Sequence, residues 1–228
     1  EPTCNQYTQQ AVLTRLVPYL ESYNLTRGSV NFTSQDVNRR LALDSSKDGK
    51  LASLDLSDAS DRVHSLLVHD MLASCPYFRG MVFACRSRKG LLPTGLTIQL
   101  QKFASMGSAL CFPIEAMVFY TLCLLAAFKE SNRPINAKNI LLFKKNIFVY
   151  GDDIFVPVGL VPVVQSIFKD FCLKVNAQKS FWTGKFRESC GQDAYDGVDV
   201  TSIYVRRMLP LHRRDVSSAI SSVSLSNQ

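Results

Sequence analysis

The chain contains few of the residue patterns that build cross-links, zinc sites or catalytic triads. Its seven cysteines include no Cys-x-x-Cys pair, and its three histidines show no metal-ligand spacing with them. These absences argue against a disulfide framework and a zinc site, and they are typical of a reducing compartment. No Ser-His-Asp or Cys-His arrangement is evident, which favours chemistry in which the protein supplies no nucleophile.

Long apolar runs are also scarce. The longest, residues 114–128, contains Glu115 and is shorter than the ~20 residues that a membrane-spanning helix needs. We therefore interpret it as a buried helix and expect no contact with a membrane. The hydrophobic content of 46% is enough for a sizeable core, and the net charge of +7 favours a polyanionic partner such as nucleic acid.

The most informative stretch is residues 147–156, in which Gly151, Asp152 and Asp153 interrupt two apolar runs. Two short apolar runs joined at a glycine predict a β-hairpin with a tight turn, and Gly151 can take the positive φ that the turn needs. Two adjacent carboxylates beside a core repel each other, and a divalent cation would relieve that cost. The alternative is an ordinary polar turn, because Gly and Asp are common in turns.

A second acidic site lies about 100 residues earlier in the chain. Residues 51–56 predict a strand that ends at Asp55, and residues 62–72 have helical spacing. Asp58 and Asp61 precede or begin that helix, where an acidic side chain is stabilising by itself, so a purely structural role stays open for both. Asp55 lies between two leucines at a strand end, which makes it a candidate metal ligand.

These two acidic sites predict metal chemistry if the strand and the hairpin are neighbours in one sheet. Asp55, Asp152 and Asp153 could then hold two Mg²⁺ ions about 4 Å apart. Such a pair of ions stabilises both the attacking and the leaving oxygen of an in-line phosphoryl transfer. We therefore expect Mg²⁺ as the cofactor, with Mn²⁺ as a substitute.

Three other segments carry weaker signals. Residues 33–36 predict the start of a helix that carries Arg39 and Arg40. Residues 75–100 predict a β-rich excursion with two turns. The small-residue loop 105–108 precedes a helix, and it either lets a ligand approach the backbone or caps that helix.

Three of these stretches resemble motifs of palm-domain RNA-dependent RNA polymerases. Residues 55–61 (Asp-Leu-Ser-Asp-Ala-Ser-Asp) resemble motif A, residues 105–108 (Ser-Met-Gly-Ser) with 111–115 (Cys-Phe-Pro-Ile-Glu) resemble motif B, and residues 150–153 (Tyr-Gly-Asp-Asp) resemble motif C. Their order and spacing also match those of the family.

The sequence resembles even more closely the replicases of positive-strand RNA bacteriophages, the levivirus group. The segments that carry this closer resemblance are Leu-Lys-Val-Asn at 173–176, Phe-Arg-Glu-Ser-Cys-Gly at 186–191 and Gly-Val-Asp-Val at 197–200. The resemblance covers nearly the whole chain. It implies RNA-directed RNA synthesis in viral genome replication, by two-metal nucleotidyl transfer.

The resemblance also implies a fold, namely the α+β palm domain of a right-hand polymerase, with an antiparallel sheet packed on helices and part of the fingers. The implied division is 1–50 as a fingers-derived segment, 51–74 as palm with motif A, 75–100 as a fingers excursion, 101–200 as palm with motifs B to E, and 201–228 as the start of the thumb. We expect the chain to come from an enzyme about twice its length, whose basic triphosphate-binding segment precedes residue 1.

Individual roles follow from the resemblance, motif by motif. As metal ligands it implies Asp55, Asp152, the more weakly bound Asp153 and the carbonyl of Leu56. For the nucleotide it implies Asp61 as the reader of the ribose 2′-hydroxyl and Ser105, Gly107 and Ser108 as the loop beside the templating base pair. Lys179, or Lys174 in its place, would protonate the pyrophosphate. RNA or template contacts fall to Arg39, Arg40, Tyr150 and Gly151, and residues 186–191 would grip the primer strand.

The partners implied are an RNA template, the nascent RNA, NTPs and host translation elongation factors Tu and Ts, in the cytoplasm of the bacterial host. Two other interpretations stay open. A reverse transcriptase has the same palm, although it usually places an aromatic residue where Asp61 stands. A basic RNA-binding module without catalysis would not need the acidic cluster, because phosphate binding requires cations.

Overall fold

The structure is a computed structural model that describes residues 2–203, 207, 209–210, 212 and 214–226. The helices are α1 (Thr3–Ser22), α2 (Asp36–Asp48), α3 (Ala59–Arg62), α4 (Ser65–Met71), α5 (Pro76–Ala84), α6 (Cys111–Ser131), α7 (Ala137–Phe143), α8 (Val161–Asp170) and α9 (Val216–Ser226), with 3-10 turns η1 (Lys144–Asn146) and η2 (Val158–Leu160). The strands are β1 (Leu51–Leu54), β2 (Leu56–Ser57), β3 (Lys89–Leu91), β4 (Thr97–Gln99), β5 (Phe148–Tyr150), β6 (Asp153–Pro157), β7 (Lys174–Val175), β8 (Phe186–Ser189), β9 (Gln192–Tyr195) and β10 (Val198–Asp199). Helices combined with small antiparallel sheets confirm the predicted mixed class.

The central sheet has the strand order β1-β6-β5, and both pairings are antiparallel. Its strands consist largely of buried apolar and β-branched residues, which pack well on a pleated surface. Isolated bridges widen the sheet at both edges. Val30 pairs with Val149 of β5, and Phe181 pairs with Ser53 of β1. The predicted hairpin at 147–156 is confirmed as β5 and β6.

Helix α6 forms the centre of the core. It is buried on nearly all sides, including Ile114, Phe119 and Cys123, each at 0% exposure. Within the described residues it is the one helix long and apolar enough to cross a membrane, yet 78% of its apolar window is buried inside the protein. The buried helix predicted for residues 114–128 is therefore confirmed, and it is several residues longer than the apolar run.

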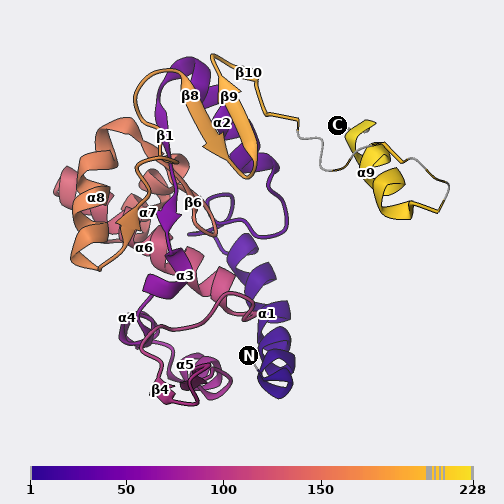
Figure 1. The fold of residues 1–228 in the computed structure, drawn as a ribbon. Coiled ribbons are helices and arrows are strands. Elements are labelled where there is room, and N and C mark those ends of the chain that lie inside the picture. The colour runs from indigo at the N-terminus through magenta and orange to yellow at the C-terminus, as the bar shows by residue number, and fades with distance from the viewer. Residues whose placement is uncertain (1, 204–206, 208, 211, 213, 227–228) are drawn as a thin grey trace.

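The smaller elements lie at the two ends of the body in Figure 1. At one end α2 packs beside the three-stranded sheet β10-β9-β8. At the other end lie α5 and the β3–β4 hairpin. Helix α8 lies along one side of the body, and α9 stands apart from it.

Two predicted segments differ in the structure. Residues 75–100 are only partly β, because Pro76 starts helix α5, where its missing N–H costs nothing, before β3 and β4 form. The single helix expected over 62–72 is broken between α3 and α4. At this break Phe103 donates its N–H to the Val63 carbonyl and Ser65 donates to the Gln101 carbonyl, and these non-local bonds replace two helical ones.

The C-terminal segment is described only in part. The sequence Ile-Tyr-Val-Arg at 203–206 also predicts β-structure, but residues 204–206 lie outside the described part of the chain. The serine-rich end, for which the sequence indicates no clear core, forms α9, of which only Ser218 is buried.

Candidate active site

The Gly-Asp-Asp turn is fixed by an aromatic ring as well as by its strands. Tyr150 pairs with Asp153 across the hairpin, so Gly151 and Asp152 form the two-residue turn, and Gly151 has a φ of +61°. A Cβ at Gly151 would lie 2.0 Å from Cε2 of Phe112 on α6. Glycine is therefore required here both by its backbone angle and by the close approach of that ring.

Strand register brings the first acid to this hairpin. Leu54 pairs with Ile154 at the end of β1, so the next residue, Asp55, comes opposite Asp153. Asp55 is the residue between β1 and β2, and its carboxylate accepts a 2.9 Å hydrogen bond from the Asn176 side chain. The Asn176 N–H also donates to the Asp55 carbonyl at 2.9 Å. The convergence predicted for strand and hairpin is thus present in the backbone.

Burial and nearby charges act on Asp55 in opposite directions. Burial raises the pKa of Asp55, the Asn176 hydrogen bond lowers it, the Asp152 charge raises it and the Lys179 charge lowers it. The resultant pKa lies above the ordinary value, because burial and the Asp152 charge outweigh the Asn176 hydrogen bond and the Lys179 charge. Lys179 is exposed and follows an Asx turn at Asn176, which places its ammonium within electrostatic reach of Asp55.

Asp153 faces a different partner. Its Oδ2 accepts hydrogen bonds from the Cys190 N–H at 3.1 Å and from the Cys190 thiol at 3.4 Å. Burial raises the pKa of Asp153, and the Asp152 charge raises it further, whereas the hydrogen bond from the Cys190 N–H lowers it. Asp153 is therefore hydrogen-bonded to the segment that follows β8, while the charge of Asp152 acts on Asp55.

Asp55 and Asp152 together suit a hard cation, but they do not form a complete set of metal ligands. Among the described residues, no three His, Cys, Asp or Glu side chains lie together closely enough to hold a metal ion. Asp55 and Asp152 are carboxylates at adjacent strand ends, and the Asp152 charge acts on Asp55. Mg²⁺ commonly binds through one or two carboxylates and completes its shell with water and substrate phosphates, so this donor set suits it.

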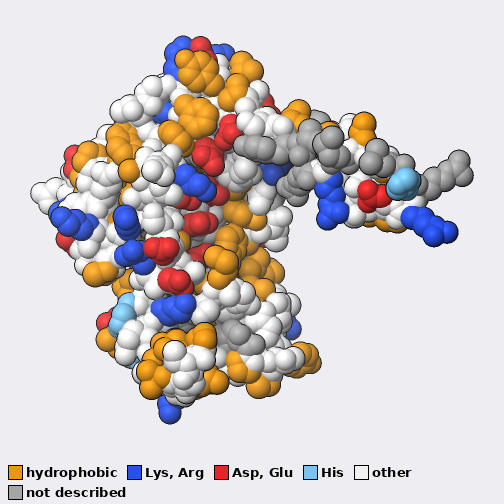
Figure 2. All heavy atoms as spheres, viewed as in Figure 1, with side chains coloured by type: hydrophobic (Ala, Val, Ile, Leu, Met, Phe, Trp, Pro, Cys, Tyr) orange, Lys and Arg blue, Asp and Glu red, His pale blue; other side chains and the backbone are white. Residues whose placement is uncertain are grey.

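A pocket of about 440 Å³ lies beside the turn. Five predicted site residues line it, namely Leu56, Asp61, Gly107, Ser108 and Asp152. The other predicted residues lie outside this lining, namely Asp55, Asp153, Ser105, Lys179, Arg39, Arg40, Tyr150 and Gly151. Figure 2 shows acidic side chains gathered in the middle of this face of the molecule, with basic side chains beside them.

Glu115 is a buried acid in the lining of this pocket, to which sequence reasoning assigned no chemical role. It is only 7% exposed, and Cys111 donates its thiol to the Glu115 carboxyl at 3.8 Å. Burial raises the pKa of Glu115 to about 8, and the Asp152 charge contributes to the increase. The side chain is therefore mostly protonated at neutral pH.

This pKa predicts a pH-dependent stability. Because the pKa of Glu115 rises from 4.5 in the unfolded chain to about 8 in the folded one, its contribution to the unfolding free energy is complete below pH 4.5 and is lost as the pH rises to about 8. We expect wild type to lose on the order of 3 kcal/mol across that window relative to Glu115→Gln. Urea unfolding of both proteins in EDTA from pH 4.5 to 8 measures the difference, and parallel curves would contradict it.

Asp61 is held by a lysine. It lies on α3 at the rim of the pocket, and its carboxylate forms an ion pair with Lys102 at 2.5 Å. Lys102 lies three residues before Ser105, where the 105–108 loop begins, and it belongs to none of the recognised motifs, so only the fold identifies it. The ion pair links the segment of motif A to the approach of motif B.

Two glutamines of α1 anchor the 105–108 loop, and sequence reasoning missed both. Gln9 is 1% exposed, and its side-chain oxygen accepts hydrogen bonds from Ser108 Oγ at 2.8 Å and from the Ala109 N–H at 3.0 Å. Gln6 donates to the Gly107 carbonyl at 3.1 Å. Their i, i+3 spacing puts both on one helix face, but nothing in the sequence shows which loop they meet.

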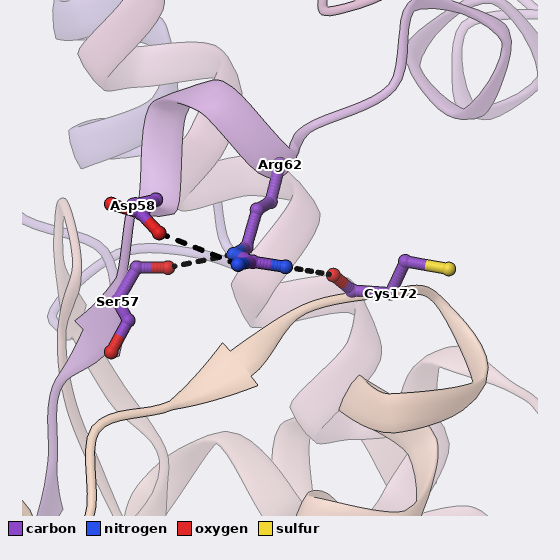
Figure 3. Close-up of polar contacts among 4 residues, drawn as sticks. All are labelled: Ser57, Asp58, Arg62 and Cys172. Atoms are coloured by element: carbon purple, nitrogen blue, oxygen red, sulfur yellow. Dashed lines mark hydrogen bonds and ion pairs between the residues drawn. The ribbon is translucent and has the colours of Figure 1, made fainter.

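Arg62 joins three parts of the chain around the motif A turn (Figure 3). Its guanidinium donates to the Ser57 carbonyl at 3.1 Å, to the Asp58 carboxylate at 3.3 Å and to the Cys172 carbonyl at 3.4 Å. Cys172 precedes β7, which pairs with β2. Arg62 therefore ties the turn after Asp55 to the segment that leads to Asn176.

Comparison with known proteins identifies the family. The sequence matches the RNA replicase, beta-chain family over residues 1–215. It is 35% identical over 180 residues to the RNA-directed RNA polymerase subunit beta of Escherichia virus Qbeta, which covers 79% of this chain and 28% of that relative. It is 33% identical over 207 residues to the RNA-directed RNA polymerase beta chain of Escherichia phage MS2, which covers 91% of this chain and 34% of that relative.

The chain thus spans about a third of the length of the curated relatives it matches, rather than the half expected from sequence. The matches confirm the resemblance found in the three motifs, and the chain belongs to the RNA replicase beta-chain family.

Proposed function

We propose that these residues form the catalytic palm of an RNA-directed RNA polymerase and that they extend RNA by two-metal-ion nucleotidyl transfer. One observation carries the proposal. Asp55 and the Asp152 turn meet at adjacent strand ends, beside a pocket that Asp61 and the Gly107 loop also line. The relatives named as RNA-directed RNA polymerases support the same activity for the longer chain.

Asp55 and Asp152 would hold the ions, with the Leu56 carbonyl as a further oxygen ligand. Mg²⁺, when bound, activates the attacking 3′-hydroxyl and neutralises the triphosphate. Asp153, which Cys190 holds by two hydrogen bonds, would act as a weaker ligand or orient the hairpin. Lys179 keeps its ammonium near Asp55, where it could protonate the departing pyrophosphate.

The expected substrates are NTPs and an RNA template. The division into palm, fingers and thumb segments, binding of elongation factors Tu and Ts, and action in the host cytoplasm all stay predictions. The test is template-directed incorporation by a replicase chain of the relatives' length that contains these residues, on homopolymer RNA with the complementary NTP. Incorporation should require both template and Mg²⁺. Binding of RNA that needs no Mg²⁺, together with no incorporation, would support a non-catalytic module instead.

Sugar choice provides a second test. Asp61→Ala should narrow the preference for NTP over dNTP by about tenfold or more, because a carboxylate that accepts the 2′-hydroxyl distinguishes the two sugars. The kcat/KM for each nucleotide measures the effect. Asp70→Ala removes an exposed acid from α4 and is the matched control. An equal loss of kcat/KM for both sugars would assign Asp61 a structural role with Lys102.

A further inference from the structure

We propose that α2 positions the Gly-Asp-Asp hairpin, and that Arg39 acts through Cys190 rather than as an RNA contact. The inference rests on the proposed function in one respect: an effect on metal binding and catalysis is expected because the hairpin carries the proposed metal ligands. It changes the role predicted for Arg39 from sequence. Helix α2 lies next to β8 and β9 in the fold, close to the hairpin (Figure 1).

A closed ring of hydrogen bonds starts and ends on the hairpin. The Gln35 side chain donates to the Tyr150 hydroxyl at 3.4 Å, and Arg39 Nη2 donates to Gln35 Oε1 at 3.0 Å. Arg39 Nε donates to the Cys190 carbonyl at 3.2 Å, and the Cys190 N–H donates to Asp153 Oδ2 at 3.1 Å. Tyr150 and Asp153 then close the ring, because they pair across the hairpin.

A buried asparagine adds a second bridge from the same helix. Asn38 is 1% exposed, and its Nδ2 lies 3.4 Å from both the Asp153 carbonyl and Ser189 Oγ. Within the described part of the chain its Oδ1 has no hydrogen-bond partner. A buried acceptor without a partner lowers the free energy of unfolding, so the Asn38 amide occupies this position at the expense of stability. The hairpin and β8 are thus joined to α2 by two neighbouring side chains.

Backbone strain marks Cys190 as the part of the ring that needs support. Its φ is +52°, in the left-handed region that residues other than glycine adopt only with backbone strain. Such conformations persist only where surrounding contacts determine them. Arg39 holds the Cys190 carbonyl and Asp153 accepts from its N–H, so the two bonds fix the strained residue from both sides.

The geometry of Arg39 favours positioning over phosphate binding. Its rigid guanidinium fork directs Nε and Nη2 at two fixed acceptors, which a flexible lysine ammonium cannot reproduce. Arg40, the next residue on α2, is exposed, and in the described part of the chain its side chain makes no hydrogen bond. Arg39→Lys and Arg40→Lys therefore make a matched pair, since both retain charge and replace a guanidinium, but only the first removes a guanidinium that is hydrogen-bonded to Gln35 and Cys190.

The test follows the Cys190 thiol with iodoacetamide and peptide-mapped mass spectrometry, in the absence of metal, RNA and nucleotide. We expect Arg39→Lys to raise the alkylation rate of Cys190 several-fold and Arg40→Lys to leave that rate unchanged. Gln35→Ala, which opens the same ring without altering charge, should raise it as well. An unchanged Cys190 rate in both Arg39→Lys and Gln35→Ala would overturn the proposal.

A second measurement separates this inference from the proposed function. Mn²⁺ binding, followed by electron paramagnetic resonance, should weaken several-fold in Arg39→Lys and remain at the wild-type value in Arg40→Lys. In the longer replicase chain Arg39→Lys should lower kcat and leave the KM for template unchanged. A raised template KM with unchanged kcat, Mn²⁺ affinity and Cys190 reactivity would instead make Arg39 an RNA contact. The alkylation result stands even if the chain does not polymerise.

Discussion

Asp152→Asn is expected to lower nucleotide incorporation by several orders of magnitude in a replicase chain that contains these residues. Asp152 lies in the hairpin turn, lines the pocket, and exerts its charge on both Asp55 and Glu115. An amide of the same size retains the turn but removes the charge of one proposed metal ligand, and with it much of the expected stabilisation of the developing negative charge. Single-nucleotide extension with Mg²⁺ measures the loss.

The control for this substitution is Asp170→Asn, which removes an exposed acid at the end of α8. Circular dichroism of both variants should match wild type, so that loss of rate is not loss of fold. Incorporation by Asp152→Asn within about tenfold of wild type would contradict the metal-ligand assignment.

Gly151→Ala is expected to destabilise the chain more than any other single methyl addition among its described glycines. The new Cβ would lie 2.0 Å from Phe112 Cε2, and the backbone would keep a φ of +61°. Gly28→Ala is the matched control, because its φ is +80° and no atom lies within 4 Å of the added Cβ. The left-handed backbone alone costs about 1 kcal/mol, so we expect roughly that loss at Gly28 and at least ~3 kcal/mol at Gly151.

Urea unfolding of the two variants gives both values. Adding Phe112→Ala to Gly151→Ala should cost less than the sum of the two single changes, because the second substitution removes the clash that the first creates. Equal losses at Gly28 and Gly151, or strict additivity with Phe112→Ala, would show that the ring yields to the methyl group.

The parts of the site that the sequence predicted depend on local pattern. The hairpin follows from two apolar runs joined at Gly151, and Asp55 is identified by its place at the end of an apolar strand. The buried helix follows from a long apolar run. Each of these signals lies within about ten to twenty adjacent residues, where period and turn chemistry act directly.

The missed parts depend on contacts between distant segments. Gln9 meets Ser108 across 99 positions, and Arg62 meets Cys172 across 110. Nothing in the sequence near Gln9 or Arg62 states which segment will be its partner. The break between α3 and α4 has the same cause, because Phe103 donates to the Val63 carbonyl where a helix would have continued.

The turn after Asp55 limits how motif A can vary between relatives. Asp58 has a φ of +55°, and Gly, Asn and Asp enter that region most easily among the amino acids. In a library of all substitutions at position 58, we therefore expect Asn and Gly to be retained and β-branched residues to be depleted, even when only folding is selected. An aspartate that recurs at this position in an alignment would then reflect backbone shape, and its recurrence would not by itself indicate a role in catalysis.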